Sequence, residues 1–253
     1  MTVEGDVWRW ISKENTHFVD GAVTSACPVQ ATARQTFIGN GTLAFWNVQS
    51  DSDGGSSLKF SEDITAKFGG WKTVRADADN AFNMVVRDNA TIGALGNWTY
   101  GPEDSFKSAT EASARALTVI GGSATRVKFD TEGHTVTLVD PLNVEKWSTV
   151  VKQGEGALVL ASADNKLADS EFELLEGELK IDEVQSFGKL TFDGGKIALG
   201  DNFAADSYEL LFTAKKIVGN VVTSGRCRVR TIAGEDSVSV YARRERGTAV
   251  VIR

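Results

Sequence analysis

The sequence KQGEGALVL, residues 152–160, places two glycines among polar residues directly before an alternating apolar strand. A similar sequence pattern recurs as LLEGELKI at 174–181 and as TFDGGKIAL at 191–199. Glycine accepts the positive φ of a tight corner, and its missing side chain lets neighbouring backbones approach closely. The recurring order of strand, glycine and strand therefore predicts a chain that turns a corner at regular intervals.

Apolar residues follow a period of two along most of the chain, with glycine, asparagine and aspartate at the breaks. This pattern is typical of many short strands. Examples are TLAFW at 42–46, NMVV at 83–86, RVKF at 126–129, HTVTLV at 134–139 and ALVL at 157–160. Residues 105–117 have alanine-rich spacing compatible with a helix, and 201–205 match it in part. The sequence predicts an all-β protein.

The spacing of similar strands decides between two all-β folds. Phe129 aligns with Phe192, and Asp130 aligns with Asp193. The marker positions, which lie 22, 23, 18 and 19 residues apart, are Phe129, Val151, Leu174, Phe192 and Leu211. A period near twenty that tolerates insertions favours a β-solenoid, whose coils stack on one another. The alternative is a Greek-key β-sandwich, whose strands are also short.

In a solenoid, alternate residues of each strand point toward the axis and stack on the residues of the next coil. One coil cannot bury its own apolar face, so neighbouring coils supply the core for one another. The predicted inward residues are Leu158, Leu160, Leu179, Ile181, Ile197 and Leu199.

Composition limits the class of protein. The chain has 253 residues, of which 42% are hydrophobic and 24% charged, as in an ordinary globular protein. We expect residues 1–253 to form a single β-solenoid domain. The formal net charge of −7 argues against a nucleic-acid partner, which would need a basic face. No apolar run is long enough for a membrane span, and the N-terminus has no signal-like segment.

Residues 152–181, KQGEGALVLASADNKLADSEFELLEGELKI, resemble the autotransporter-associated β-strand repeat. The family pattern joins a lysine, two glycines, a leucine strand, a loop with asparagine and a second glycine-led strand. The matching residues are Lys152, Gly154, Gly156, Leu158, Leu160, Asn165, Leu175, Gly177, Leu179 and Ile181. The Tyr-x-Gly that usually follows the asparagine is missing, because Lys-Leu-Ala stands at 166–168.

The resemblance extends over residues 88–215, with 1–87 and 216–253 as end coils. It implies a right-handed parallel β-helix that is secreted by a bacterium. It also implies a role at the cell surface as a passenger, adhesin or structural stalk. The family motif is architectural and implies no active site.

Residues that carry catalytic chemistry are scarce. The two histidines, His17 and His134, have no metal-ligand partner at helical or hairpin spacing. No nucleophile-elbow, zinc-protease or phosphate-loop motif occurs. His134 follows a glycine turn in an alternating strand, and we expect it to face solvent. The sequence predicts no catalytic residue and no cofactor, so we expect the protein not to be an enzyme.

Acidic pairs offer a weak metal-binding pattern. Asp77 and Asp79 would share one face of a strand. The stretch SDSDGGSS at 50–57 presents Asp51 and Asp53 but lacks the further ligands of known calcium loops. We interpret these carboxylates as solvated surface groups and predict no metal site.

Tryptophans offer two interpretations. Trp8 and Trp10 share one face of DVWRWI at 6–11, and Trp46, Trp71, Trp98 and Trp147 are scattered. Exposed tryptophans can bind sugars, such as host or matrix glycans, or they can cap the first coil and pack against a partner.

Both ends of the chain read as strands, VEGDVWRWI at 3–11 and GTAVVIR at 247–253, and we expect no capping element. Residues 225–253 contain seven arginines and three acids, whereas 1–63 contain eight acids and four bases. Opposite charges and open strand edges favour head-to-tail contact between copies. The predicted subunit-interface residues are Val7, Trp8, Trp10, Ile11, Cys27, Cys227, Arg243, Arg244, Val250, Val251 and Ile252.

The two cysteines are too few for a disulfide scaffold. Cys27 and Cys227 are 200 residues apart, on the order of ten coils or ~48 Å at ~4.8 Å per coil. A disulfide needs Cα atoms within about 7 Å, so a bond within one chain is excluded. Two separate thiols, or a bond between stacked copies, remain as alternatives.

These observations lead to a ranked expectation of function. First is an extracellular structural protein, a subunit of a bacterial surface fibre that assembles with itself head to tail through solenoid ends and terminal strands. Second is a monomeric adhesin or glycan-binding passenger domain. Third is a polysaccharide lyase or hydrolase with its site on a β-helix face.

Overall fold

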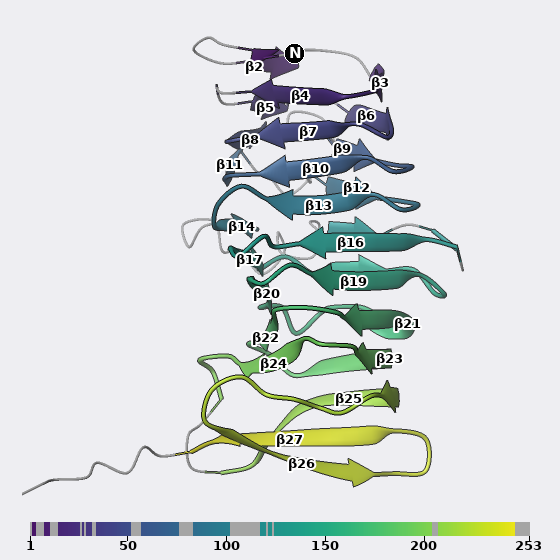
Figure 1. Ribbon diagram of the computed structural model, residues 1–253, viewed down its shortest axis with the longest axis vertical. Helices are drawn as coiled ribbons and strands as arrows, with labels where there is room; N and C mark the ends of the chain where they lie inside the picture. The colour runs from purple at the N-terminus through teal and green to yellow at the C-terminus, as the bar shows by residue number, and fades with distance from the viewer. Residues whose placement is uncertain are drawn as a thin grey trace, which may run out of the picture.

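The strands wind into coils that stack along one axis, so the molecule is an all-β solenoid (Figure 1). The computed structural model describes residues 2–3, 8–10, 15–25, 27, 29–31, 34–51, 57–75, 83–101, 117–119, 121–122, 124–203 and 207–245. Strands of successive coils pair in parallel, with the exception of two strands at the C-terminal end. The predicted parallel β-solenoid is confirmed, and the β-sandwich alternative is wrong.

Each coil has three sides. The first side lies in one long sheet of twelve strands, of which the two C-terminal strands stack on the third side. In spatial order they are β1 (Thr2–Val3), β4 (Ala22–Ser25), β7 (Thr42–Phe45), β10 (Thr65–Phe68), β13 (Thr91–Ala94), β16 (Arg126–Asp130), β19 (Thr149–Gln153), β21 (Leu167–Leu174), β23 (Gln185–Phe192), β25 (Glu209–Val218), β27 (Val238–Arg244) and β26 (Cys227–Ala233).

The second side consists of two separate sheets. The four-stranded sheet contains β2 (Trp8–Trp10), β5 (Val29–Ala31), β8 (Val48–Asp51) and β11 (Trp71–Arg75). The five-stranded sheet contains β14 (Trp98–Tyr100), β17 (Thr135–Leu138), β20 (Ala157–Leu160), β22 (Glu178–Ile181) and β24 (Lys196–Leu199).

The third side begins with a six-stranded sheet. Its strands are β3 (Asn15–Val19), β6 (Arg34–Gly39), β9 (Ser57–Phe60), β12 (Asn83–Val86), β15 (Leu117–Val119) and β18 (Leu142–Val144). The stack continues into the first halves of the longer strands β21, β23 and β25. Asn143 bridges Lys166, Leu167 pairs with Phe187, and Phe187 pairs with Ala214.

The predicted inward ladders are confirmed. Leu158, Leu179 and Ile197 occupy one register column of the second side, and all three are fully buried. Leu160, Ile181 and Leu199 form the next column, and all three are buried.

Two of the predicted marker positions are wrong. In the long sheet, Phe129 pairs with Lys152, and Lys152 pairs with Leu174. Lys152 therefore occupies the position that we assigned to Val151. Leu211 lies on the third side, because the neighbouring Phe212 pairs with Gln185 and the chain returns to the first side only at Lys216, which pairs with Lys189. A longer coil at this point shifts the register that a constant period predicts.

Glycine corners connect the long sheet to the second side. A Cβ atom at Gly156 would lie 1.9 Å from the carbonyl oxygen of His134. A Cβ atom at Gly177 would lie 2.3 Å from the carbonyl oxygen of Gly154, and Gly177 has a φ of 67°. Consecutive corners are in backbone contact, which only glycine permits. The spacing of KQGEGALVL and LLEGELKI is thus the spacing of two stacked corners.

The helix-compatible window at 105–117 lies mostly outside the described residues, and Leu117 begins strand β15. Residues 201–203 form a turn, and the described part of the chain contains no helix. Within that part, nothing has the length and apolarity of a helix that crosses a membrane.

Candidate functional site at the ends of the solenoid

The N-terminal end of the third side is formed by β3. The ring of His17 stacks on that of Phe37, with centroids 4.9 Å apart and an interplanar angle of 19°. His17 Nε2 lies 2.8 Å from Gln35 Oε1. Strand β3 pairs with β6 on one edge, and no described strand pairs with its other edge. Among the described residues, the third side therefore begins with an edge strand whose inward residues include His17 and the buried Val19.

The C-terminal end carries a cap, contrary to our expectation. Strands β26 and β27 form an antiparallel hairpin, and β27 pairs with β25 (Figure 1). Val240 and Ala242 of β27 are buried on the core. The stretch GED at 234–236 between two strand patterns is a hairpin signal that we missed. Period-two patterns alone do not separate a hairpin from two stacked coils.

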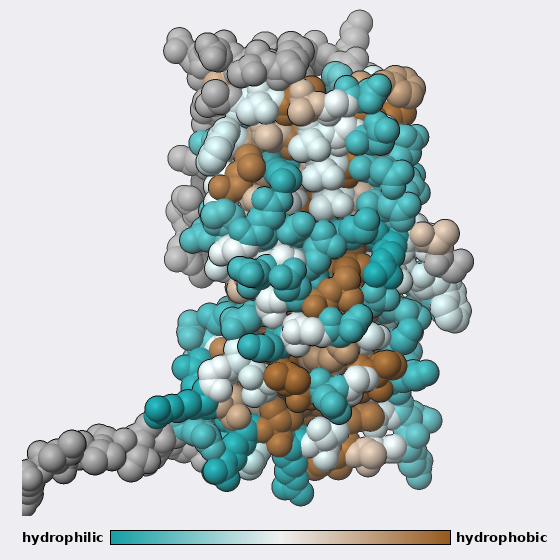
Figure 2. Space-filling view, in the orientation of Figure 1, coloured by the Kyte–Doolittle hydropathy of each residue, from teal (hydrophilic) through white to brown (hydrophobic). Residues whose placement is uncertain are grey.

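Within the hairpin, β26 is the outer strand and forms the last described edge of the stack. Its residues are half-buried or exposed, because no described strand covers it. Figure 2 shows apolar side chains gathered on the C-terminal part of the visible face. Exposed large hydrophobic residues at this end of the chain are Val184, Tyr208, Val218, Val222 and Ile232.

The two end strands run in the same direction. Strand β27 is antiparallel to β25, and β26 is antiparallel to β27, so β26 is parallel to β25. The first half of β25 belongs to the third side through the pairing of Ala214 with Phe187. Strand β27 pairs with this same half of β25, from Glu209 to Ala214, so β3 and β26 are the first and last described strands of the third side.

Two hydrogen bonds show which backbone groups of β26 face the open edge. Gly234 N donates to Ser237 O at 2.7 Å, and Glu245 N donates to Arg226 O at 2.7 Å. Bonded pairs alternate in an antiparallel ladder, so the even-numbered residues of β26 bond to β27. The residues whose N–H and C=O groups point to the open edge are Cys227, Val229, Thr231 and Ala233.

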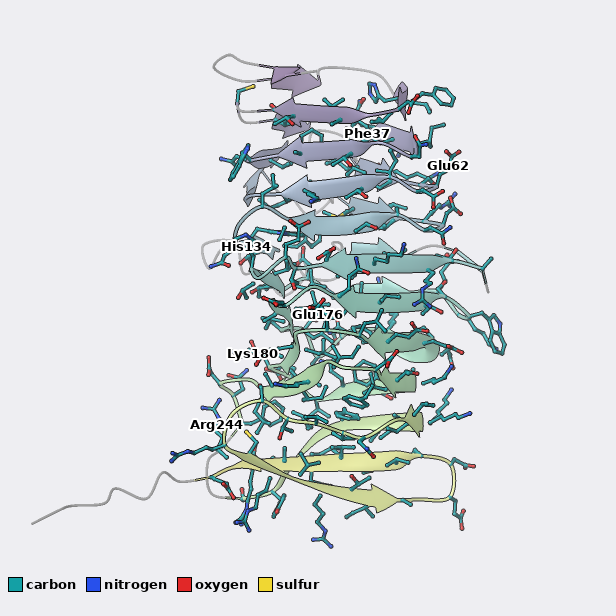
Figure 3. All side chains as sticks on the ribbon, in the orientation of Figure 1. Phe37, Glu62, His134, Glu176, Lys180 and Arg244 are labelled. Carbon is teal, nitrogen blue, oxygen red and sulfur yellow. The ribbon has the colours of Figure 1, made fainter. Side chains whose placement is uncertain are left out.

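The two predicted arginines are bound within their own chain. Arg244 Nη2 donates to Gly200 O at 2.8 Å and lies 3.3 Å from Asp201 Oδ1. The guanidinium of Arg243 lies 5.0 Å from the ring centroid of Tyr208. Figure 3 places Arg244 beside the C-terminal hairpin. Both residues lie at the predicted end of the molecule, and Arg244 attaches the cap to the last coil.

The other predicted interface residues are only partly described. Trp8 pairs with Val29 and Trp10 pairs with Ala31, so β2 is the first strand of the second side. The remaining predicted residues lie outside the described part of the chain and are Val7, Ile11, Val250, Val251 and Ile252.

Both cysteines are free thiols. Cys27 follows β4 and is buried, and Cys227 begins β26 and is half-buried. Ten inter-strand steps separate β4 from β26, or about 48 Å at ~4.8 Å per step. The predicted separation of the two thiols within one chain agrees with this topology.

Residues considered for chemistry are dispersed. His134 was expected to face solvent from within a strand; it lies in the bend before β17 and is partly exposed. Asp53, Asp77 and Asp79 lie outside the described residues, and the side chain of Asp51 is not described. The described residues contain no group of three or more metal-ligating side chains.

The tryptophans divide into two kinds. Trp46 and Trp147 are 53% and 63% exposed, whereas Trp98 is buried and Trp71 is half-buried. Trp147 also has a positive φ of 71°, which is rare for a bulky side chain.

Lys152 lies at the glycine corner between β19 and β20. In the sequence analysis it was named only as one residue of the repeat pattern. It is fully buried. Its Nζ donates to the backbone oxygens of Gly154 at 2.6 Å, Gln153 at 3.0 Å and Glu176 at 3.1 Å. The ammonium group therefore ties one corner to the corner of the next coil. The sequence feature that could have revealed this burial is a lysine at a position that aligns with the apolar residues Phe129 and Leu174.

The stability contributed by Lys152 is expected to depend on pH. Burial lowers its pKa to about 8, and the charges of Asp130, Glu176 and Glu178 oppose this only in part. In the unfolded chain, the pKa of lysine is about 10.4. Below a pH of about 8, the lysine is charged in both states, so burial of charge penalises folding. Between these two pKa values, only the unfolded state keeps the proton, so raising the pH stabilises the folded state.

We therefore compare urea unfolding of the wild type and Lys152→Met from about pH 7 to about pH 10. The difference in unfolding free energy should move in favour of the wild type as the pH rises, because methionine does not titrate. A flat or opposite trend would mean that the three carbonyl groups keep the ammonium charged.

Comparisons of this chain with protein-family models, curated proteins and solved structures found no match. The resemblance to the autotransporter-associated repeat remains a prediction from the wording of residues 152–181.

Proposed function

We propose that this protein is a structural subunit that assembles head to tail into a fibre at a bacterial cell surface. The observation that carries the proposal is the common direction of β3 and β26, the first and last strands of the third side. Strand β3 of one copy can pair with β26 of another in parallel, as β3 pairs with β6. The extracellular location rests on the family resemblance alone.

Backbone pairing supplies the first contribution to such a contact. The open edge of β26 presents the N–H and C=O groups of its odd-numbered residues, and the open edge of β3 presents its own. A strand added to a sheet edge gains main-chain hydrogen bonds, and side chains set the register.

Side chains on the inward face supply the second contribution. Val229 is half-buried and Thr231 is exposed, although both face the same side as the buried Val240 and Ala242. A second copy would bring its His17 and Phe37 layer over these residues. The apolar surface that β26 leaves uncovered would then be removed from water.

Charge supplies selectivity. Arg230 lies on the outward face of β26 and is exposed. Cationic residues on an edge strand discourage pairing with unmatched strands. An acidic partner lowers this penalty, and residues 1–63 contain eight acids against four bases.

The test places a lysine at Thr231, where the inward side chain and the edge N–H both face the proposed contact. Thr231 is exposed, so Thr231→Lys should fold as the wild type does. A charge on the inward side of an edge strand blocks stacking. We expect filaments of the wild type in negative-stain microscopy and monomers of Thr231→Lys in light scattering.

The matched control is Ile232→Lys, which adds the same charge one residue away on the outward face. Ile232 is 42% exposed and bonds to β27 through its backbone. This variant should assemble as the wild type does. Filaments of Thr231→Lys, or a wild type that stays monomeric at high concentration, would contradict the proposal.

A further inference from the structure

The corner between the third side and the first side changes form along the stack. In the coil that leads into β19, the corner is a β-turn of residues 145–148, in which Ser148 N donates to Glu145 O at 3.2 Å. In the next three coils, β21, β23 and β25 each run through the corner as one strand (Figure 1). A turn is therefore stacked on a bent strand at this level.

Trp147 occupies the third position of this β-turn. Its φ of 71° lies in the region that favours glycine and asparagine, so a tryptophan at this position costs free energy. Burial in the core does not offset that cost, because Trp147 is 63% exposed. A large exposed aromatic side chain at a strained backbone position indicates a binding role rather than a packing role.

A cleft with a volume of about 310 Å³ opens beside this indole, at the lower end of the range for small-molecule sites. Its lining includes three small residues, Ala168, Ser170 and Gly188. A Cβ atom at Gly188 would lie 2.5 Å from Ser170 O, so the backbones of these two coils are in close contact. The small residues therefore leave room next to a large aromatic side chain.

The charges of this cleft can be counted, because the chain segments that border it are described throughout. These segments are 145–149, 167–172, 186–190 and 213–217. The charged residues of the lining are Lys146, Asp169, Glu171, Lys189 and Lys215. Three lysines thus face two carboxylates.

Two of the lysines neutralise the two carboxylates. Lys215 Nζ donates to Asp169 Oδ1 at 2.7 Å, and Lys189 Nζ donates to Glu171 Oε2 at 2.8 Å. The hydrogen bond from Lys215 is the largest cause of the lowered pKa of Asp169, and the charge of Lys146 is the smallest cause that lowers it. The pairing therefore keeps the Asp169 carboxylate ionised.

The third lysine keeps its charge beside the indole. Lys146 Nζ lies 4.8 Å from the ring centroid of Trp147. Within the described part of the chain, Lys146 forms no ion pair. The cleft therefore presents one uncompensated positive charge next to an exposed aromatic ring.

We infer that this cleft binds an acidic carbohydrate, through one sugar residue that carries a carboxylate. The C–H face of the sugar ring packs on the Trp147 indole, and the carboxylate compensates the charge of Lys146. Lysine only donates hydrogen bonds and an ionised carboxylate only accepts them, whereas a sugar hydroxyl does both. Sugar hydroxyls therefore match a rim on which lysines and carboxylates alternate. This corner site is independent of the proposed end-to-end assembly.

The test titrates the full-length protein by calorimetry with trisaccharides of galacturonate, glucuronate and mannuronate, and with the methyl ester of each. The ester keeps the sugar and removes the charge. We expect at least one of the three acids to bind, and its ester to bind about three- to fivefold more weakly, the size of an exposed ion pair. Inorganic phosphate and a tetraglutamate peptide carry charge without a sugar ring and should not bind.

Trp147→Asn removes the indole and supplies a residue that adopts positive φ readily, so this variant should fold as stably as the wild type. It should bind the acid about tenfold or more weakly. The indole N–H signal that is missing from its ¹H–¹⁵N NMR spectrum belongs to Trp147, and in the wild type this signal should shift on binding. Trp46→Ala, which removes another exposed tryptophan, is the matched control and should bind as the wild type does.

Lys146→Gln separates the charge from the ring. It should weaken binding of the acid about three- to fivefold and leave binding of the ester unchanged. The inference is wrong if none of the three acids binds, or if an ester binds as tightly as its acid. It is also wrong if phosphate or the peptide binds as tightly as the acid, or if Trp147→Asn binds unchanged.

Discussion

Replacing Gly156 with alanine should destabilise the protein by more than about 3 kcal/mol, among the largest effects of a single added methyl group. A Cβ atom at this position would lie 1.9 Å from His134 O and 2.5 Å from His134 N. Both atoms belong to the backbone of the preceding coil, so no side-chain rotation relieves the contact.

The substitution also acts on the hydrogen bonds of the corner. Ala157 N donates to His134 O at 2.9 Å, and Glu178 N donates to Gly156 O at 3.0 Å. Moving the corner outward lengthens both bonds, which lie on opposite sides of the same coil. Three consecutive coils are therefore disturbed.

Urea unfolding followed by circular dichroism measures this effect. Gly122→Ala is the matched control, because Gly122 is exposed, has no unusual φ and has no atom within 4 Å of its added Cβ. That variant should keep wild-type stability or gain slightly from a less flexible unfolded chain. Equal stability of the two variants would mean that the corners do not require glycine.

The part of the fold that could be predicted from the sequence is the part in which a sequence pattern repeats. Between residues 152 and 199 the corners carry glycine and the strands alternate, so both the turn positions and the inward residues follow from local chemistry. The register columns through Leu158 and Leu160 confirm the predicted inward residues.

Prediction failed where the period changes. The marker series assumed spacings near twenty, but Thr191 pairs with Val218, 27 residues further on, so Leu211 fell short of the long sheet. Insertions at corners alter the number of residues per coil without altering the stack. The antiparallel cap was missed for a related reason, since an alternating strand has the same pattern in either direction.

The ends of the solenoid and the aromatic cluster of Phe68, Trp71, Trp98 and Tyr100 depend on contacts between distant residues. Trp71 and Trp98 looked scattered in the sequence, because 27 residues separate two positions that stack in one column. The sequence analysis named Lys152 only as part of the repeat motif, although three backbone oxygens of two corners surround its ammonium group. Such features follow from register, which becomes visible only once the coils are aligned.

Replacing Phe68 with alanine should cost about 3 to 5 kcal/mol of unfolding free energy, as expected for removal of a fully packed phenylalanine. Phe68 is fully buried and contacts Phe45 and Phe60 as well as Trp71 and Trp98. Its ring centroid is 6.0 Å from each of Phe45 and Phe60, and 5.3 Å from Trp98.

The large effect has two causes. Removal of the ring leaves a cavity among aromatic neighbours that are themselves held in register by paired strands, so collapse around the cavity is limited. The contacts that hold Trp71 and Trp98 in place are lost at the same time. Near-ultraviolet circular dichroism should therefore lose the tryptophan signal at lower denaturant concentration than in the wild type.

Phe18→Ala is the control, since Phe18 is 84% exposed and its removal should change stability by less than about 0.5 kcal/mol. If Phe68→Ala behaved like Phe18→Ala, the aromatic cluster around Phe68 would not stabilise the fold. Phe68→Leu keeps most of the buried volume, so it should be destabilised only moderately.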